Sequence, residues 1–328
     1  MTMTENTAAL SAHAPATAPE RERRIAADPT LPSSLRRLHD APQTLVMGVL
    51  NVTADSFSDG GLWLDPDKAA QHGLDMMGDG ADIIDIGAES TRPGAQRVDA
   101  ETEKSRVLTA VNALTPHGAM LSIDTTRASV AQAALDAGAQ IINDVSGGQM
   151  DPDMPRVIRD NDCLYILQHW RAWLSGSASG VPDRDTSVYE HGVLADVIDE
   201  MRRQLDAVLD AGVAPGRIIL DPGLGFSKPD AERNMPLLAG LARIQKLGYP
   251  VLIGQSRKRF IGGILAGLDW CAPADDAQAA EDKDNATAGL SALCAEHGAW
   301  AVRVHDVRRS VAAVAMGRAW REAAQAQA

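Results

Sequence analysis

The sequence is poor in aromatic residues, in cysteine and in positive charge. Aromatic residues make up 4% of the 328 residues, there are three cysteines, and 31 basic residues face 44 acidic ones, which gives a net charge of −13. No cysteines form a CxxC pair, so neither a disulfide framework nor a zinc site is expected. The acidic balance disfavours binding to nucleic acid or to anionic membranes. No apolar stretch is long enough to span a bilayer and no secretory signal is visible, so we expect a cytoplasmic protein.

Short apolar runs that end in polar clusters recur along the chain. Each run has the length and composition of a buried parallel strand. The stretches between them show apolar residues at helical spacing, which is typical of βαβ units. Eight such units, with no GxGxxG fingerprint, favour a closed (β/α)8 TIM barrel over an open dinucleotide-binding sheet. The eight runs are Leu45–Leu50, Ile83–Ile86, Leu121–Ile123, Ile141-Ile142, Leu164–Leu167, Ile218–Leu220, Val251–Ile253 and Trp300–Val302.

The helical patterns and the stretches without one give the expected organisation of the chain. Residues 1–40, rich in Ala, Thr, Pro and charge, are expected to form a disordered tail, and residues 41–328 a single barrel domain. Two longer loops are expected at Ser175–Ser187, which could be a lid or a tolerated insertion, and at Asp269–Asp284. Helices are expected over Asp67–Met77, Asp99–Leu114, Ala128–Ala137, Val188–Ala211, Arg233–Lys246, Asn285–Glu296 and Val307–Ala324.

Three hydrogen-bonding side chains follow strands in the middle of the chain. Asp124, Asn143 and Asp221 each stand at a predicted strand end, on the rim where barrel enzymes carry their active sites. Two carboxylates and an amide suit the edge of a planar amino-pyrimidinone heterocycle, because each carboxylate accepts two adjacent N–H groups. Each residue alone could equally cap the following helix. The occurrence of all three in one barrel favours a binding site.

A second group of strand-end residues is cationic. Arg92, Arg257, Lys258, Arg303 and His305 come from three strand ends of an acidic protein, which indicates an anion site on the rim. The alternative is a set of ion pairs with Asp85, Glu89 or Asp306. Ser90 and Thr91 add hydroxyl groups beside Arg92. Asn51 and Asp55, after the first strand, carry side-chain oxygens that could help to hold Mg2+.

Several of these segments resemble the signatures of one known family. The chain is similar to dihydropteroate synthases, of the actinobacterial type at His169–Ala172, and the resemblance spans residues 44–322. The segments that carry it are 51–61 (NVTADSFSDGG), 85–94 (DIGAESTRPG), 122–125 (SIDT), 143–148 (NDVSGG), 221–228 (DPGLGFSK), 256–260 (SRKRF) and 303–307 (RVHDV).

The resemblance implies a barrel enzyme of folate biosynthesis. Such enzymes condense 6-hydroxymethyl-7,8-dihydropterin pyrophosphate with p-aminobenzoate by an SN1-like step that uses Mg2+, and sulfonamides compete with p-aminobenzoate. The family also implies a homodimer formed by the last helices, with small molecules as substrates.

The resemblance also implies roles for residues of this chain. The residues expected to bind the edge of the pterin are Asp124, Asn143, Asp221 and Lys258, with Gln168 beside the ring. Arg303 is expected to stack on or flank the pterin and, with His305, to bind pyrophosphate. Asn51 is expected to help bind Mg2+ on the leaving group. Ser256, Arg257 and Phe226 are expected to line the p-aminobenzoate pocket. Asp55 and Phe57 belong to the first active-site loop, and Ser90, Thr91 and Arg92 belong to the second. The residues expected to act in catalysis are Asp221, Lys258, Arg303 and His305.

The sequence departs from the common family pattern at a few positions. Gln168 stands where Met is common, Ala54 where Pro is common, and Ala88 where Gly is common. A buried amide that lacks a partner is costly, so Gln168 bears on substrate geometry. Two other functions remain open at this point. One is a pterin-dependent methyltransferase domain, which would not need the Ser256–Lys258 pocket, and the other is a catalytically silent, pterin-binding paralogue.

Overall fold

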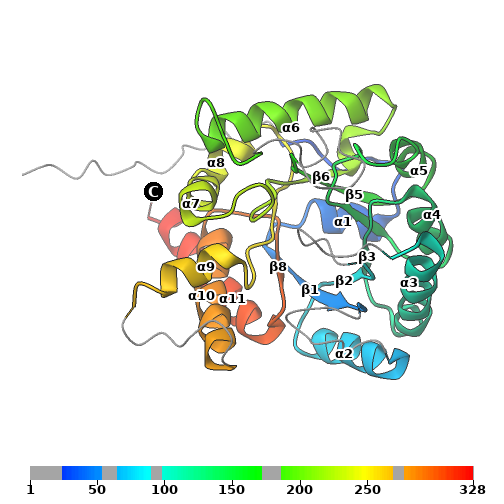
Figure 1. The fold of residues 1–328 in the computed structure, drawn as a ribbon, viewed down its shortest axis with the longest axis horizontal. Helices are drawn as coiled ribbons and strands as arrows, with labels where there is room; N and C mark the ends of the chain where they lie inside the picture. The colour runs from blue at the N-terminus through cyan, green and yellow to red at the C-terminus, as the bar shows by residue number, and fades with distance from the viewer. Residues whose placement is uncertain (1–23, 54–64, 90–97, 172–185, 269–276, 328) are drawn as a thin grey trace, which may run out of the picture.

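Eight parallel strands form a closed barrel in a computed structural model that describes residues 24–53, 65–89, 98–171, 186–268 and 277–327 (Figure 1). The strands pair in the order β6-β5-β4-β3-β2-β1-β8-β7. A single parallel bridge between Leu220 and Val251 joins β6 to β7, so the predicted (β/α)8 fold is confirmed. The strands are β1 Leu45–Asn51, β2 Ile83–Gly87, β3 Leu121–Asp124, β4 Ile141–Asp144, β5 Leu164–Gln168, β6 Ile218–Asp221, β7 Leu252–Ile253 and β8 Ala301–Val304.

Helices surround the strands, mostly where the sequence predicts them (Figure 1). The stretch Arg233–Lys246 is two helices rather than one, because the chain turns at Gly240, where any Cβ would meet Leu194 and the Pro236 carbonyl oxygen. The short helices α5 and α9 were not predicted. The helices are α1 Ser33–His39, α2 Pro66–Gly78, α3 Ala100–Leu114, α4 Ala128–Asp136, α5 Met154–Asp160, α6 Val193–Asp210, α7 Ala231–Ala239, α8 Leu241–Gln245, α9 Arg259–Leu265, α10 Ala277–Glu296 and α11 Val307–Gln325.

The two predicted loops fare differently. Residues 277–284 of the expected loop Asp269–Asp284 form the first two turns of α10, so that part of the prediction is wrong. Buried side chains from this stretch, including Asp282 and Asp284, anchor it to the barrel. Most of Ser175–Ser187, with its two interpretations as a lid or an insertion, lies outside the described residues.

The apolar residues divide into two clusters on the two faces of the barrel wall. The larger cluster lies between strands and helices and includes Ile84, Ile86 and Leu220. The smaller one fills the inside of the barrel with alternate strand residues, among them Ile83 and Ile141. This alternation leaves the last inward-facing position of each strand for polar residues.

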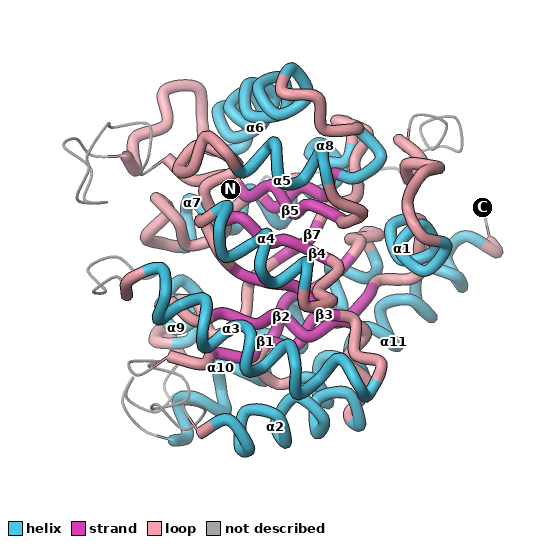
Figure 2. The backbone as a smooth tube through the Cα atoms, turned by 90° about the vertical axis from the view of Figure 1, so that its right-hand side faces the viewer, coloured by secondary structure: helices cyan, strands magenta, loops and turns pink. Residues whose placement is uncertain are grey.

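The amino-terminal segment is part of the barrel domain rather than a tail from residue 24 onward. Leu31 and Leu35 of the α1 region are 2% and 1% exposed and belong to the cluster inside the barrel. Arg217 donates to Asp28 at 2.7 Å, and α1 lies beyond one end of the strands (Figure 2). The expected disordered tail of residues 1–40 is therefore wrong for residues 24–40, because their few apolar side chains close the bottom of the barrel. Residues 1–23 lie outside the described residues.

Candidate active site

The carboxyl ends of the strands bring the predicted pterin-binding side chains into one layer. In the strand register, Asp124 lies opposite Asn143, and Gln168 lies opposite Asp221. Asp124, Asn143, Gln168 and Asp221 are all 8% exposed or less. These residues do not cap the helices that follow them. The N-cap positions of α4, α5 and α7 are occupied by Arg127, Asp153 and Asp230.

Arg303 connects this layer through two ion pairs. Its Nε–H donates to Oδ2 of Asp85 at 2.6 Å, and its NH2 group donates to Oδ2 of Asp124 at 2.9 Å. Asn143 donates to the same oxygen of Asp85 at 3.1 Å. The ion-pair alternative is thus correct for Arg303 and Asp85, yet the pair lies in the mouth of the barrel. Asp85 was missed as a site residue, although it stands two positions before Gly87 on the same face of β2.

Several buried polar atoms of this layer have no hydrogen-bond partner among the described residues. They include both acceptors and a donor, on neighbouring inward-facing side chains. Native proteins rarely leave such atoms unpaired, so a cluster of them indicates a polar ligand. The cluster consists of Asp85 Oδ1, Ser122 Oγ, Asp124 Oδ1, Asn143 Oδ1 and Gln168 Nε2. Its mixed acceptors and donor match the edge of an amino-pyrimidinone ring.

Asp221 and Lys258 lie on the opposite side of the mouth. Burial raises the pKa of Asp221, against the opposing influence of Lys258. Burial likewise lowers the pKa of Lys258 to about 8, with Asp221 acting to raise it. A hypothetical Cβ on Gly254 would lie 3.6 Å from Asp221 and 4.0 Å from the Lys258 ammonium. Gly254 therefore leaves open space between the two charges, which a bound ring could fill.

The predicted p-aminobenzoate residues line the same side of the mouth. Phe226 packs edge-on against Trp170 with ring centroids 5.1 Å apart, and the Lys258 ammonium lies 4.7 Å from the Phe226 centroid. Ser256 Oγ lies 2.9 Å from His305 Nδ1 and accepts from the His305 backbone N–H at 3.1 Å. The end of β8 is thereby joined to the loop after β7.

Arg257 makes contacts that the sequence did not predict. Its guanidinium makes two hydrogen bonds to Asp284 of α10, at 2.7 and 2.8 Å. Its backbone adopts a φ of +56°, in the left-handed region. Asp284 lies inside a stretch that was expected to be a loop, so this partner could not have been named from the sequence. Arg257 therefore also anchors the loop after β7 to α10.

Five predicted site residues lie outside the described residues. They are the members of the two active-site loops, and nothing in the structure tests them: Asp55, Phe57, Ser90, Thr91 and Arg92. The residues that flank the second loop, Glu89 and Val98, are described. Arg127 forms an ion pair with Glu89 before the loop and donates to the Val98 carbonyl at 2.8 Å after it. Arg127 thereby connects the two ends of this loop.

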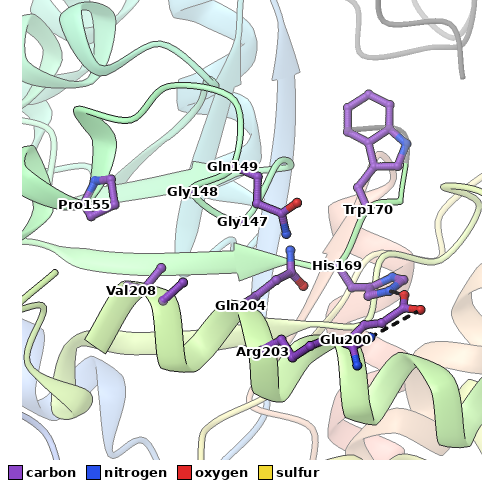
Figure 3. A pocket seen from close by; sticks show the side chains of 11 residues that line it. Gly147, Gly148, Gln149, Pro155, His169, Trp170, Glu200, Arg203, Gln204 and Val208 are labelled. Carbon is purple, nitrogen blue, oxygen red and sulfur yellow. Dashed lines mark hydrogen bonds and ion pairs between the residues drawn. The ribbon is translucent and has the colours of Figure 1, made fainter. Parts of the chain in front are cut away.

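A cavity of about 320 Å³ lies beside the barrel mouth, between the β4–α5 connection and α6 (Figure 3). His169 and Trp170, which follow β5, face it on one side. Glu200 and Gln204 of α6 face it on the other, and Glu200 lies within hydrogen-bonding distance of His169. Gln204 donates to the Gln168 carbonyl oxygen at 3.4 Å, which connects this cavity to the layer of polar residues.

The residues present can contribute only sparsely to an Mg2+ site. No group of three His, Cys, Asp or Glu side chains suited to a metal occurs in the described part of the chain. Asn51 ends β1, and its Oδ1 lies 3.5 Å from where a Cβ on Gly87 would stand. Mg2+ in enzymes commonly keeps several waters and takes most other ligands from substrate phosphates. Asn51 fits that pattern as a single oxygen ligand.

Comparison with known proteins agrees with this site. The family model described as pterin binding enzyme matches residues 47–305. The dihydropteroate synthase of Mycobacterium leprae is 48% identical over 276 residues, which cover 84% of this chain and 93% of that protein. The dihydropteroate synthase of Bacillus subtilis is 40% identical over 81% of this chain and 85% of that protein.

Solved structures show the same similarity. A Yersinia pestis dihydropteroate synthase with a sulfonamide drug superimposes with a TM-score of 0.76 at 33% identity, over 87% of this chain and 96% of that one. The Burkholderia cenocepacia enzyme complexed with 7,8-dihydropteroate gives a TM-score of 0.73 at 35% identity, over 87% and 94% of the two chains.

Fold and relatives together define a barrel transferase of the pterin-binding type. The chain belongs to the pterin-binding enzyme family, and within it to the dihydropteroate synthases. It is a transferase of folate biosynthesis with dihydropteroate synthase activity. None of the helices in the described ranges is long and apolar enough to cross a membrane.

Proposed function

We propose that this chain joins 6-hydroxymethyl-7,8-dihydropterin pyrophosphate to p-aminobenzoate at the strand-end site and releases 7,8-dihydropteroate and pyrophosphate. The observation that carries this proposal is the cluster of buried polar atoms without partners in the barrel mouth. Asp124 and Asn143 offer acceptors to the amino-pyrimidinone edge, and Gln168 offers an N–H donor to a ring carbonyl or nitrogen. Asp221 and Lys258 would hold the opposite part of the ring.

The charges of the site support a dissociative, SN1-like step. As the bond between the exocyclic carbon and the pyrophosphate oxygen breaks, positive charge spreads over the dihydropterin, where Asp124 and Asp221 stabilise it. Arg303 and His305, at the end of β8, would bind the departing pyrophosphate. Mg2+ held by the pyrophosphate and Asn51 would neutralise further negative charge on the leaving group.

The second substrate would enter beside Phe226, Ser256 and Arg257. Its aryl ring would pack on Phe226, and its carboxylate would lie near the hydroxyl of Ser256 and the backbone N–H groups of the loop after β7. Its amine nitrogen is neutral at physiological pH and attacks the cationic carbon without a strong protein base. A sulfonamide with the same aryl amine would compete for this pocket.

Steady-state turnover with Mg2+ and both substrates tests the function directly. We expect pyrophosphate release that depends on p-aminobenzoate and is blocked by a sulfonamide. Deuteration of the exocyclic methylene tests the mechanism, because a dissociative step gives a normal secondary isotope effect on kcat/KM. An isotope effect of unity would indicate direct displacement instead, and absence of turnover despite pterin binding would indicate a silent paralogue.

We also propose a cytoplasmic homodimer formed through the last two helices. Large apolar side chains on α10 and α11 are exposed, with Leu293, Met316 and Trp320 at 57%, 70% and 73%. The two helices also pack closely on each other, since a Cβ on Gly317 of α11 would stand 2.1 Å from the Ala292 carbonyl oxygen of α10. Light scattering should show a dimer that Trp320→Glu converts to a monomer, whereas an unchanged mass would contradict this interface.

A further inference from the structure

Lys228 is a buried lysine that the proposed reaction does not use. Its side chain is 1% exposed and follows the Gly-rich turn after β6. Its ammonium donates to the carbonyl oxygens of Gly223 and Phe226, at 3.0 and 2.9 Å, and lies 3.1 Å from His169 Nδ1. A lysine ammonium has three N–H donors, so these three acceptors use all of them. No carboxylate within the described ranges lies at ion-pair distance from this ammonium.

His169 connects Lys228 to a carboxylate. Because its Nδ1 accepts from the ammonium, its Nε2 carries the proton and donates to Glu200 Oε2 at 2.7 Å (Figure 3). Burial and the nearby Lys228 charge lower the pKa of His169 to about 4, which keeps the ring neutral. Although burial opposes it, hydrogen bonds from His169 and Arg171 lower the pKa of Glu200 to about 2. A neutral imidazole thus bridges an ammonium and a carboxylate.

The turn that Lys228 holds carries Phe226. Two carbonyl groups of this turn accept from Lys228, and a third, on Leu224, accepts from Lys258. Ser227, between Phe226 and Lys228, has a φ of +55°, which few non-glycine residues adopt. The surrounding hydrogen bonds must therefore hold the turn in this conformation. The position of the Phe226 ring depends on them.

We propose that Lys228, held in place by His169 and Glu200, is a positioning residue for the arylamine half of the active site. This inference rests on the assignment of Phe226 to the p-aminobenzoate pocket. Loss of the ammonium leaves the Gly223 and Phe226 carbonyl groups without their donor, and the turn relaxes. The pterin-binding atoms of Asp124 and Asn143 stand on β3 and β4 and do not depend on the turn.

The charges around Lys228 make its protonation sensitive to Glu200. Burial, together with the charges of Lys258 and Arg171, lowers the pKa of Lys228 to about 7, while Asp221 and Glu200 act to raise it. A neutral amine has only two N–H donors for three acceptors. Glu200→Gln removes a charge that favours the ammonium, so it should leave Lys228 neutral over more of the pH range.

The test compares the KM for p-aminobenzoate with the KM for the dihydropterin pyrophosphate in purified full-length variants. Lys228→Met should raise the p-aminobenzoate KM about tenfold and leave the pterin KM within about twofold. Arg202→Met, at an exposed position of α6 where the side chain pairs with Asp199, is the control and should leave both constants unchanged. Equal rises in both constants, or an unchanged p-aminobenzoate KM, would overturn the inference.

Glu200→Gln provides a second readout that holds if Lys228→Met does not fold. Compared with the original protein, its p-aminobenzoate KM should be raised just below the Lys228 value of about 7, where only the variant has lost the proton, and should match one pH unit above it, where Lys228 is neutral in both proteins. A defect that is the same at both pH values would mean a merely structural role and would overturn the inference.

Phe226→Ala separates this inference from the function on which it rests. If this variant leaves the p-aminobenzoate KM unchanged, the pocket assignment is wrong and the inference is overturned with it. If it raises that KM while Lys228→Met does not, only the role of Lys228 is overturned.

Discussion

Asp85 holds Arg303 by a 2.6 Å hydrogen bond between one carboxylate oxygen and the guanidinium Nε–H. The carboxylate is fully buried, and the same oxygen also accepts from Asn143 at 3.1 Å. Asp85 therefore orients one residue proposed to bind pyrophosphate and another proposed to bind the pterin. Because Asp85 orients two side chains that are proposed to contact substrate, we expect it to be important for turnover although it is not itself proposed to contact substrate.

Removal of this charge should impair both contacts. Asp85→Asn leaves the partly buried guanidinium of Arg303 with one fewer carboxylate partner, and we expect kcat/KM for the pterin substrate to fall about a hundredfold. Asp79→Asn, at an exposed position after α2, is the control and should retain full activity. Steady-state kinetics of the two folded variants checks this, and an Asp85→Asn enzyme with normal kcat/KM would refute the role.

Lys258 should make activity and stability respond to alkaline pH in opposite directions. Burial lowers its pKa from 10.5 to about 8, so the ammonium that we propose contacts the pterin is lost as the pH rises through that value. We expect kcat/KM to fall above pH 8. The folded state binds this proton less tightly than the unfolded chain, so the stability penalty is present below pH 8 and disappears toward pH 10.5.

Lys258→Arg tests that assignment, because arginine stays protonated. The variant should lack the alkaline limb in its kcat/KM profile, whatever its maximal rate. Denaturant unfolding at several pH values should show that it also lacks the gain in stability contributed by Lys258. If the variant keeps the same fall in kcat/KM at alkaline pH, that fall is due to the titration of a group other than Lys258.

Gln168 carries an unsatisfied donor in the free protein. Its Nε2 is buried without a partner among the described residues. Gln168→Met removes that donor at similar length, so it should raise the free energy of unfolding by about 1 kcal/mol. Gln140→Met is the contrasting control, since Gln140 accepts from the Leu121 N–H at 2.8 Å and its loss should destabilise. Urea titration of both variants without substrate gives the comparison.

The amino-terminal helix should contribute to stability without touching the reaction. Leu35 is 1% exposed at the bottom of the barrel, on the side away from the strand carboxyl ends. Leu35→Ala should lower the free energy of unfolding by about 2–4 kcal/mol and leave the KM values unchanged. Arg37→Ala, exposed on the same helix, should change neither. A Leu35→Ala protein as stable as the original would mean that α1 does not pack in the barrel.

The barrel and most of its polar mouth were predictable from local pattern. Apolar runs of strand length, separated by helical periodicity, indicate parallel strands, and parallel strands place their carboxyl ends on one rim. Asp124, Asn143 and Asp221 could therefore be grouped although they lie far apart in the chain, and the structure brings Asp124 and Asn143 into direct register. The family resemblance added their chemical roles.

Contacts between distant segments required the tertiary structure. Residues 24–40 look like a tail because their composition is polar, yet Leu31 and Leu35 find an apolar cluster inside the barrel. The pairing of Arg257 with Asp284, and of Lys228 with His169, joins side chains that no short-range pattern links. Sequence periodicity determines which face of each strand is buried. Only closure of the barrel decides which buried polar groups meet, because that depends on register and on the helices packed outside.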